Sequence, residues 1–275
     1  MEIDRRIEQL YAGYDEDARL WATPKGQLIR LRTWDLLDRL IPAGGRVLDV
    51  GGGPGTHAAH LAARGDDVHL VDPIDRHLDQ ARARSEAGSR FTVASGDARA
   101  LDHPDASVDA VLLLGPLYHL TEAGDRARAL AEAHRVLRPG GVLVAEVITR
   151  FVTLLERSLD PEHLADPIAV ANHEREAATG LSQDPVDTPA GSFWAYLHRP
   201  EELRSELVEV GFGDVRLHGV EGHAWLLGPV LGEHLAQPEP LLDALRRLES
   251  EPSLLGVSAH VVGAATKLDV ADGPG

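Results

Sequence analysis

The sequence predicts an α/β protein with a doubly wound, mostly parallel sheet, helices on both faces and a helical cap insertion. Three observations predict this fold. From Arg46 onward, short apolar or β-branched runs alternate with helical patterns. The first of these runs ends in a glycine-rich turn that leads directly into a helical pattern, and the alternation breaks after Ile148 before a further helix begins near Pro200. Strands that alternate with helices form a parallel sheet, because each helix carries the chain back to the same end of the next strand.

Seven short runs have the apolar, β-branched composition of strands within a sheet. They are 47–50, 68–71, 91–94, 108–114, 142–147, 215–220 and 256–266. Apolar residues recur at helical spacing in segments that separate most of these runs. The segments expected to be helical are 56–64, 75–86, 122–137 and 201–210. The sequence Arg-Pro-Gly-Gly at 138–141 is typical of a helix end before a strand.

The composition excludes several classes of protein. The 275 residues carry a formal net charge of −17, 43% hydrophobic residues and no cysteine. Without cysteine there is no disulfide scaffold, no thiolate metal site and no cysteine nucleophile. A surface this acidic repels phosphate backbones, so we expect no nucleic-acid partner. The charged first residues and the lack of a long apolar run predict a soluble cytoplasmic protein that does not associate with membranes.

The stretch VLDVGGGPGTHAAHLA, residues 47–62, combines a strand end, a bare turn and a helix start. Glycines let the backbone approach a ligand closely, and a helix N-terminus offers it unpaired N–H groups. A dinucleotide site would follow G-x-G-x-x-G, whereas Gly51, Gly53 and Gly55 follow G-x-G-x-G. Asp72 ends the next strand about 20 residues on, where an acid binds ribose hydroxyls in either class of nucleotide site. A plain tight turn at the glycines and a helix cap at Asp72 are the structural alternatives.

Five motifs in chain order resemble those of the class I S-adenosylmethionine (SAM)-dependent methyltransferases. They are VLDVGGGPGTH, VHLVDP, ASGDARAL, LLLGPLYHL and LRPGGVLVAEV, and they cover roughly residues 45–148. The resemblance implies a seven-stranded sheet whose last strand is antiparallel, with SAM as the cofactor and S-adenosylhomocysteine (SAH) as its product. The Asn/Asp-Pro-Pro-Tyr motif of amino-group methyltransferases that act on nucleic acids and proteins is absent. The chain is therefore more similar to bacterial small-molecule methyltransferases, including those of natural-product biosynthesis.

The resemblance also implies which residues bind the cofactor. Asp72 would hold the ribose hydroxyls, Asp97 the adenine amino group, and the backbone N–H of Ala98 the adenine ring. The full implied set is Asp49, Gly51, Gly53, Gly55, Asp72, Pro73, Asp97, Ala98 and Leu114.

Methyl transfer requires an acceptor held in line behind the methyl group, and a base for the acceptor's proton. His119 lies just after the fourth strand and is the candidate base. Its alternative role is to orient a backbone carbonyl or the cofactor's carboxylate. Tyr14 is the candidate lid residue over the cofactor. His57 and His60 lie three residues apart on one predicted helix without a carboxylate to complete a facial triad, so we expect no metal.

The placing of the aromatic residues predicts the kind of acceptor. The chain has only four Phe, four Trp and four Tyr, and most fall in the N-terminal segment, near the end of the cap, or on segments expected to face the same opening. Aromatic walls suit a flat apolar acceptor, so we expect an aromatic or heteroaromatic small molecule, with indole carbon methylation as one form of the reaction. Methylation of a hydroxyl or acid group is the alternative. The residues expected to contact the acceptor are Tyr118, Arg150, Trp194, Tyr196, Glu221 and Trp225.

Two other classes of protein stay open. A nicotinamide oxidoreductase would bind NADH rather than SAH, and the departure from G-x-G-x-x-G argues against it. A catalytically silent SAM-binding partner protein would bind the cofactor without turnover. In any of these roles the chain is expected to be a monomer or a homodimer.

The pattern divides the chain into five parts. Prolines scattered between helical patches mark the interruption after the fifth strand as a cap. The parts are an N-terminal helical lid segment at 1–40, a SAM-binding core at 41–148, a cap insertion over the acceptor pocket at 149–197, the C-terminal part of the core sheet at 198–268 and a disordered tail at 269–275.

Overall fold

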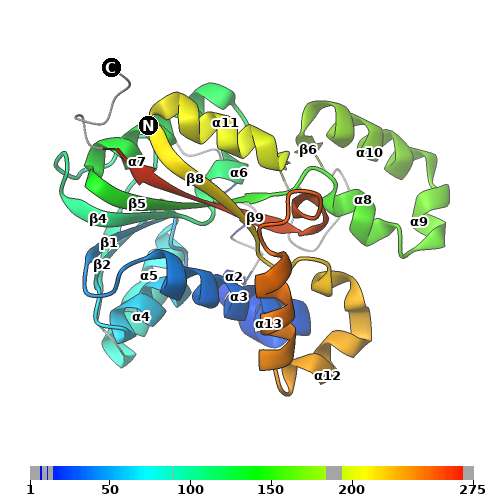
Figure 1. The fold of residues 1–275 in the computed structure, drawn as a ribbon, viewed down its shortest axis with the longest axis horizontal. Helices are drawn as coiled ribbons and strands as arrows, with labels where there is room; N and C mark the ends of the chain where they lie inside the picture. Colours follow the sequence, from blue (N-terminus) through cyan, green and yellow to red (C-terminus); the bar gives the residue numbers. More distant parts are fainter. Residues whose placement is uncertain (1–6, 8–10, 12–14, 89, 184–193, 269–275) are drawn as a thin grey trace.

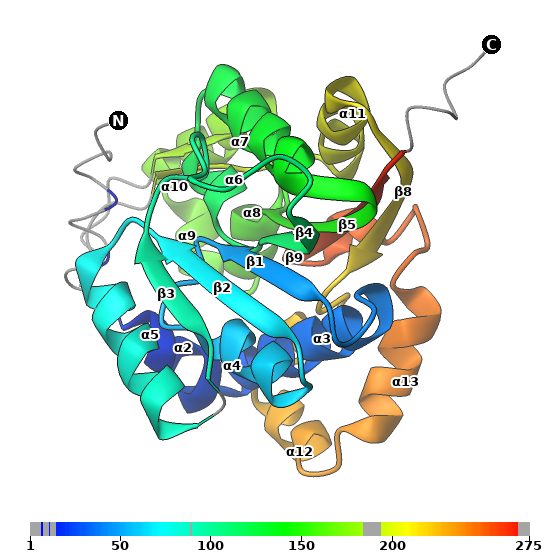
Figure 2. The same ribbon diagram turned by 90° about the vertical axis from the view of Figure 1, so that its left-hand side faces the viewer.

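A computed structural model of the chain describes residues 7, 11, 15–88, 90–183 and 194–268. These residues form a seven-stranded sheet in the order β3-β2-β1-β4-β5-β9-β8, in which β9 runs antiparallel to both of its neighbours (Figures 1 and 2). The strand order reverses between β1 and β4, and ligands of open α/β sheets bind at the carboxyl ends of strands at such a point. The mostly parallel sheet with an antiparallel last strand is thus confirmed. The strands are β1 Arg46–Val50, β2 Asp67–Asp72, β3 Thr92–Ser95, β4 Val108–Leu113, β5 Leu137–Ile148, β8 Phe212–Gly219 and β9 His260–Lys267.

Helices cover both faces of this sheet (Figures 1 and 2). Alternate residues of each central strand face opposite layers and form two separate hydrophobic clusters. In β1, Val47 packs in the cluster that contains α3, α4 and α5, and Leu48 packs in the cluster that contains α7 and α11. The bounds of these helices are α3 Pro24–Leu40, α4 Thr56–Ala63, α5 Asp75–Ala87, α7 Ala123–Val136 and α11 Pro200–Val210.

The predicted strands and helices are all present, with shifted starts at three strands. β8 begins at Phe212 rather than near residue 215. β5 begins at Leu137 rather than near residue 142, because Leu137 pairs with Val108 across an irregularity in the ladder. The last strand begins later than predicted, because Leu255–Val257 forms a short 3₁₀ helix, η2, before it. The limits of α11 follow local rules, since proline occupies its first turn and Gly211, with φ of +104°, ends it.

The segment between β5 and α11 leaves the sheet beside the end of β5 and extends to one side of it (Figure 1). Its described residues form three helices and two antiparallel strands, which are α8 Val152–Arg157, α9 Pro161–Ala165, α10 Pro167–Thr179, β6 Leu181–Gln183 and β7 Trp194–Tyr196. Apolar side chains on the outside of this segment are exposed, Ile168 by 66%. None of the helices that the structure describes is long and apolar enough to cross a membrane.

The chain between β8 and β9 forms η1 (Ala224–Val230), α12 (Leu231–Leu235) and α13 (Glu239–Leu248). α12 contacts α3, the longest of these helices, and a small hydrophobic cluster joins the two regions. The N-terminal helix α3 therefore packs against both the sheet and the C-terminal part of the chain.

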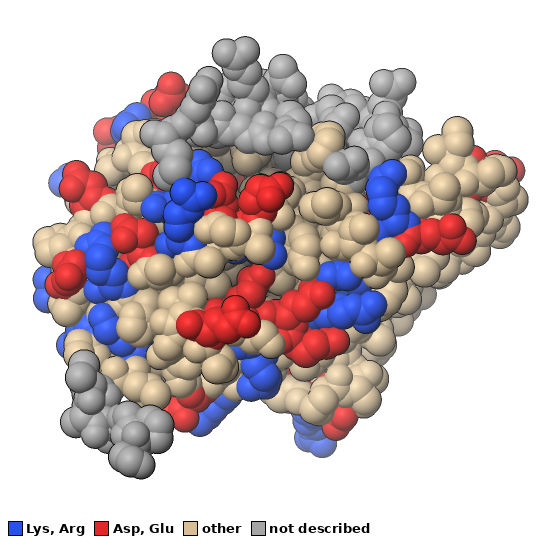
Figure 3. Space-filling view, turned by 90° about the horizontal axis from the view of Figure 1, so that it is seen from above, with Lys and Arg blue, Asp and Glu red and all other residues tan. Residues whose placement is uncertain are grey.

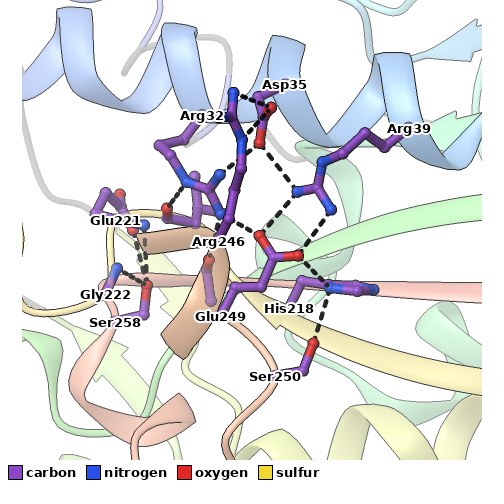
Figure 4. A network of polar contacts seen from close by, with 12 residues as sticks. Arg32, Asp35, Arg39, His218, Glu221, Gly222, Arg246, Glu249, Ser250 and Ser258 are labelled. Carbon is purple, nitrogen blue, oxygen red and sulfur yellow. Dashed lines mark hydrogen bonds and ion pairs between the residues drawn. The ribbon is translucent and has the colours of Figure 1, made fainter. Parts of the chain in front are cut away.

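A buried ionic network also joins α3 to the end of α13 (Figure 4). Arg32, with no exposed surface, contacts Glu249 at 2.6 Å and Asp35 at 2.5 Å. Arg39 contacts Glu249 at 2.8 Å and Asp35 at 3.0 Å, and Arg246 of α13 contacts Asp35 at 2.8 Å. Because α3 also lines the cleft described next, this network fixes one wall of that cleft.

Candidate active site

A cleft of about 670 Å³ lies at the carboxyl ends of β1, β2, β4 and β5. One side is formed by the loops that follow the first four strands. The other side is formed by Ile7, Tyr11, the short helix α2 (Glu16–Ala22) and α3. The volume is within the range of roughly 300–1,000 Å³ that is typical of small-molecule sites.

The glycine loop after β1 brings bare backbone to the floor of this cleft. Gly51 and Gly53 have φ of +69° and +55°, a conformation that L side chains rarely adopt. A Cβ on Gly51 would also lie 2.6 Å from Pro116. Both glycines line the cleft, whereas Gly55 is the N-cap of α4 and faces Phe91 instead. All the predicted cofactor-binding residues except Gly55 line the cleft.

Asp72, at the end of β2, is held in one orientation at the side of the cleft. Its Oδ2 accepts a hydrogen bond from the amide of Gly53 at 2.9 Å, and its Oδ1 accepts one from the amide of Ile74 at 2.8 Å. The Nδ1 of His77 lies 3.2 Å from Oδ1. A carboxylate can accept about four hydrogen bonds, so Asp72 retains capacity at Oδ2 for a hydrogen bond from a ligand hydroxyl.

Asp97 and Ala98 follow β3, the edge strand that pairs with β2. Asp97 Oδ1 accepts a hydrogen bond from the amide of Arg99 at 2.8 Å, and Oδ2 contacts the Arg99 guanidinium at 2.7 Å. Arg99 also contacts Asp125 of α7 at 2.7 Å. Burial raises the pKa of Asp97, but the hydrogen bonds from Arg99 outweigh burial and leave it below its usual value. This carboxylate therefore stays ionised and can accept hydrogen bonds from a ligand.

Asp49, the last acid of β1, is 1% exposed and lines the cleft. Burial and the nearby charge of Asp72 raise its pKa to about 7. No described residue donates a hydrogen bond to its Oδ2. A Cβ on Gly52 would lie 2.7 Å from that oxygen, so the bare backbone of the loop leaves room for the carboxylate. An unpartnered buried carboxylate oxygen is stabilised by a cationic or N–H-bearing ligand group.

His119 ends the short helix α6 (Pro116–His119) after β4 and lines the cleft. Its Nε2 lies 2.7 Å from the hydroxyl of Tyr11. Burial lowers the pKa of His119 to about 4, although Asp72 and a backbone hydrogen bond at Trp194 act to raise it. The imidazole is thus neutral at pH 7 and available to accept a proton. Tyr14, the predicted lid residue, lies outside the described residues, and Tyr11 is the tyrosine of the N-terminal segment that the structure places here.

Of the residues predicted to contact an acceptor, some lie at the cleft and others lie outside it. Tyr118 lines the cleft, and Trp194 approaches it through its backbone at His119. Arg150 lies outside it, because its guanidinium contacts Glu202 at 2.7 Å and the carbonyl of Leu197 at 2.7 Å.

The other three predicted acceptor residues also lie outside the cleft. Tyr196 lies 3.9 Å from the Arg126 guanidinium. The indole N–H of Trp225 donates to the carbonyl of Val257 at 2.9 Å. Glu221 is fully buried and accepts hydrogen bonds from Ser258 and His260. Each of these side chains is occupied by contacts within the protein, and the described residues of the segment 149–197 do not line the cleft.

Several cleft residues were not assigned by the sequence. They include Glu146 of β5, Thr33 of α3, and Glu16 and Arg19 of α2. Glu146 did carry a signal, since it is an acid within the apolar run VLVAEV of a strand expected to be buried on both faces. No group of three or more His, Cys, Asp or Glu side chains in the described ranges is arranged to hold a metal ion.

Comparisons with known proteins agree with this geometry. A family model described as "Methyltransferase domain" matches residues 47–141. An uncharacterized methyltransferase of Mycobacterium tuberculosis is 44% identical over 110 residues, which are 40% of this chain and 42% of that relative, so the match spans less than half of its length. Dimethylglycine N-methyltransferase of Parasynechococcus marenigrum is 32% identical over 206 residues, covering 68% of this chain and 70% of the relative.

A solved structure has the same fold. A SAM-dependent methyltransferase of Thermotoga maritima, described as a possible histamine N-methyltransferase, superimposes with a TM-score of 0.58 at 20% identity and covers 95% of this chain and 99% of its own. The strand order, the contact between the glycine loop and Asp72, and the similarity to these relatives all indicate the same family. The chain belongs to the class I SAM-dependent methyltransferases.

Proposed function

We propose that this chain transfers the methyl group of SAM to a small-molecule acceptor bound in the same cleft. The observation that carries the proposal is that one cleft holds both the glycine loop with Asp72 and the Tyr11–His119 pair. For transfer, the acceptor atom must lie in line behind the methyl group of SAM, and a single cleft that binds both molecules permits this arrangement. Acidic side chains gather in the middle of one face with basic ones beside them (Figure 3), and the chain carries a formal net charge of −17. A net negative charge repels phosphate backbones, which supports a small acceptor over a nucleic acid.

The residues present fit SAM. The backbone of Gly51 and Gly53 would lie against the amino-acid part of SAM. Asp72 would accept a hydrogen bond from the ribose hydroxyls, and Asp97 would accept one from the adenine amino group. The unpartnered Oδ2 of Asp49 would face a cationic part of the cofactor. When bound, SAM supplies an electrophilic methyl group on a sulfonium. The protein's part is to hold the acceptor in line and exclude water.

The acceptor in this proposal is aromatic or heteroaromatic, and its methylated atom is a ring carbon, as in an indole, or a hydroxyl oxygen. The rings of Tyr11 and Tyr118 in the cleft support a flat acceptor. A proton on an oxygen or ring carbon that is gaining a methyl group becomes strongly acidic, so a base with a pKa of about 4, such as His119, is sufficient. An aliphatic ammonium, with a pKa near 10, would not lose its proton to such a base.

The test is SAH formation from SAM across a panel of indoles, phenols, amines and carboxylic acids, with the products identified by mass spectrometry. We expect turnover with members of the indole or phenol classes and a methyl group on carbon or oxygen. Tight SAH binding without turnover of any acceptor would instead indicate a silent SAM-binding protein. Binding of NADH in place of SAH would indicate an oxidoreductase.

Asp72→Ala is expected to weaken SAH binding by about 1.5–3 kcal/mol, or roughly 10- to 100-fold. The variant loses the acceptor for the ribose hydroxyls and also frees the amides of Gly53 and Ile74, which shape the loop. Calorimetric titration with SAH measures the change. Asp79→Ala, an exposed change on the helix that follows, is the control and should bind SAH as the wild type does. Unchanged affinity in Asp72→Ala would remove this residue from the cofactor site.

A further inference from the structure

Glu146 is a buried acid in the cleft that the proposed chemistry does not use. It lies on β5, which is separated by β4 from β1 and its glycine loop, and it is 6% exposed. No hydrogen bond or ion pair joins its carboxylate to another described residue. Burial raises the pKa of Glu146 to about 7, so the cost of leaving this carboxylate unpaired is large. Such a group is retained where a ligand supplies the missing partner.

Other unpartnered polar atoms line the same cleft. The Oγ1 of Thr33 is buried without a hydrogen-bond partner among the described residues, and Thr33 is 2% exposed. α3, which carries Thr33, packs against β5, which carries Glu146. The Nδ1 of His57 on α4 is likewise buried without a described partner. Together these atoms offer a ligand one anionic and two neutral hydrogen-bonding positions.

The cations near Glu146 are already paired with other carboxylates, so its negative charge is not balanced by them. Arg19 of α2 is held by Glu16, with Nη2 2.6 Å from Oε1. His260 of β9 is held by Glu221, with Nδ1 2.5 Å from Oε1. Burial lowers the pKa of His260, but the charges of Glu221 and Glu146 outweigh it and raise it above its usual value. Each of these two cations already has a carboxylate of its own, and Glu146 is the third carboxylate facing them.

Glu146 and His119 face different neighbours within the cleft. The charges that act on His119 are those of Asp72 and His77, while those that act on Glu146 come from His260, Glu221, Arg19 and Glu16. The part of the cleft around Glu146 is therefore distinct from the part around His119 and Asp72. Apolar side chains such as Leu20 and Ile29 line the cleft as well, so the charge of Glu146 is poorly screened by water.

We infer that Glu146 binds a cationic amino group of the acceptor, as a recognition group separate from the atom that is methylated, with Thr33 and His57 as additional hydrogen-bonding partners. The inference rests on the proposed function, because it assigns one end of the acceptor in that same cleft. The acceptor is then an organic amine, protonated at neutral pH, that carries the ring or hydroxyl to be methylated at its other end.

The test compares pairs of ligands that differ only in an amino or a hydroxyl group. The pairs are tryptamine with tryptophol, tyramine with tyrosol, and phenethylamine with 2-phenylethanol, each titrated calorimetrically into protein saturated with SAH at pH 8. The amines stay protonated there, and Glu146 is mostly ionised. We expect at least one amine to bind at least tenfold tighter than its alcohol, and the preference to fall to within twofold in Glu146→Gln. The preference should also shrink in the wild type below pH 7, as Glu146 gains a proton.

The controls separate this inference from the proposed function. Glu209→Gln removes an exposed acid of α11 and should leave the preference unchanged. Glu146→Asp keeps the charge and should keep a preference for amines, which covers the case in which Glu146→Gln does not fold. Failure of the wild type to bind SAH would overturn the proposed function. Normal SAH binding with equal affinities within every pair, no amine binding, or a full preference in Glu146→Gln would overturn the inference alone.

Discussion

Glu249→Ala is expected to lower the free energy of unfolding by about 3 kcal/mol. Glu249 contacts Arg32 at 2.6 Å and Arg39 at 2.8 Å, and Arg32 has no exposed surface (Figure 4). Removing one partner of a buried pair leaves the other charge buried with less compensation, which costs about 3–5 kcal/mol. The remaining contact of Arg32 with Asp35 places the expectation at the lower end of that range. Chemical denaturation at pH 7 measures the difference.

The pH dependence of that difference identifies its source. Burial raises the pKa of Glu249, but hydrogen bonds from His218, Arg39 and Arg32 outweigh it and lower the value to about 2. A carboxyl group whose folded pKa is depressed stabilises the fold fully above its unfolded pKa of about 4.3, and this stabilisation is lost as the pH falls through the folded value. The gap between wild type and variant should therefore be constant from pH 7 to 5 and narrow below about pH 4.

The control is a neighbouring acid without buried partners. Glu251 is exposed and its carboxylate hydrogen-bonds Ser253. Glu251→Ala should change the unfolding free energy little. A Glu249→Ala variant as stable as Glu251→Ala would mean that the network in Figure 4 does not hold α3 against the C-terminal part of the chain.

The fold could be predicted from the sequence because its signals are local. Runs such as 68–71 and 108–114 carry apolar residues on both faces, with one polar residue in each, as expected for a strand between two helical layers, and glycine or proline marks many of the turns. The displaced start of β5 is a tertiary effect. Leu137 joins β5 only because Val108 of β4 lies opposite it, and a sequence pattern does not contain that pairing.

The glycine-loop side of the cleft could also be predicted from the sequence, for the same reason. Gly53 and Asp72 belong to two adjacent motifs, and the fold brings their backbone and side chain within 2.9 Å. The residues predicted to contact the acceptor could be placed less well from the sequence. The aromatic residue Tyr196 was expected in the pocket, but its direction is set by Arg126, which lies 70 residues earlier in the chain and packs on its ring.

Two residues show what sequence spacing could not supply. Tyr11 and His119 are separated by 108 positions, and only the folded chain places the hydroxyl 2.7 Å from the ring nitrogen. Glu146 was visible as an acid in an apolar strand, yet its role depends on which nearby cations already have partners. Charge compensation is a property of the assembled cleft, and no single segment contains it.

His119→Ala is expected to lower kcat by about 10²- to 10⁴-fold, the range for loss of a positioned general base. The neutral imidazole faces the cleft, and burial holds its pKa at about 4. The wild-type kcat should therefore fall as the pH drops through about 4, rather than near the usual histidine value of about 6.5. SAH affinity, measured by calorimetry, should change by no more than a few fold. His234→Ala, at an exposed position on α12, serves as the control and should keep wild-type kcat.

His119→Asn distinguishes proton transfer from positioning. Asparagine can still accept a hydrogen bond from the Tyr11 hydroxyl, but it cannot take up a proton at neutral pH. If His119 is the base, kcat in His119→Asn should be as low as in His119→Ala, and the loss of activity near pH 4 should disappear from the profile. If kcat is instead restored toward the wild-type value, the ring serves to fix Tyr11 over the cleft, and the acceptor's proton leaves by another route.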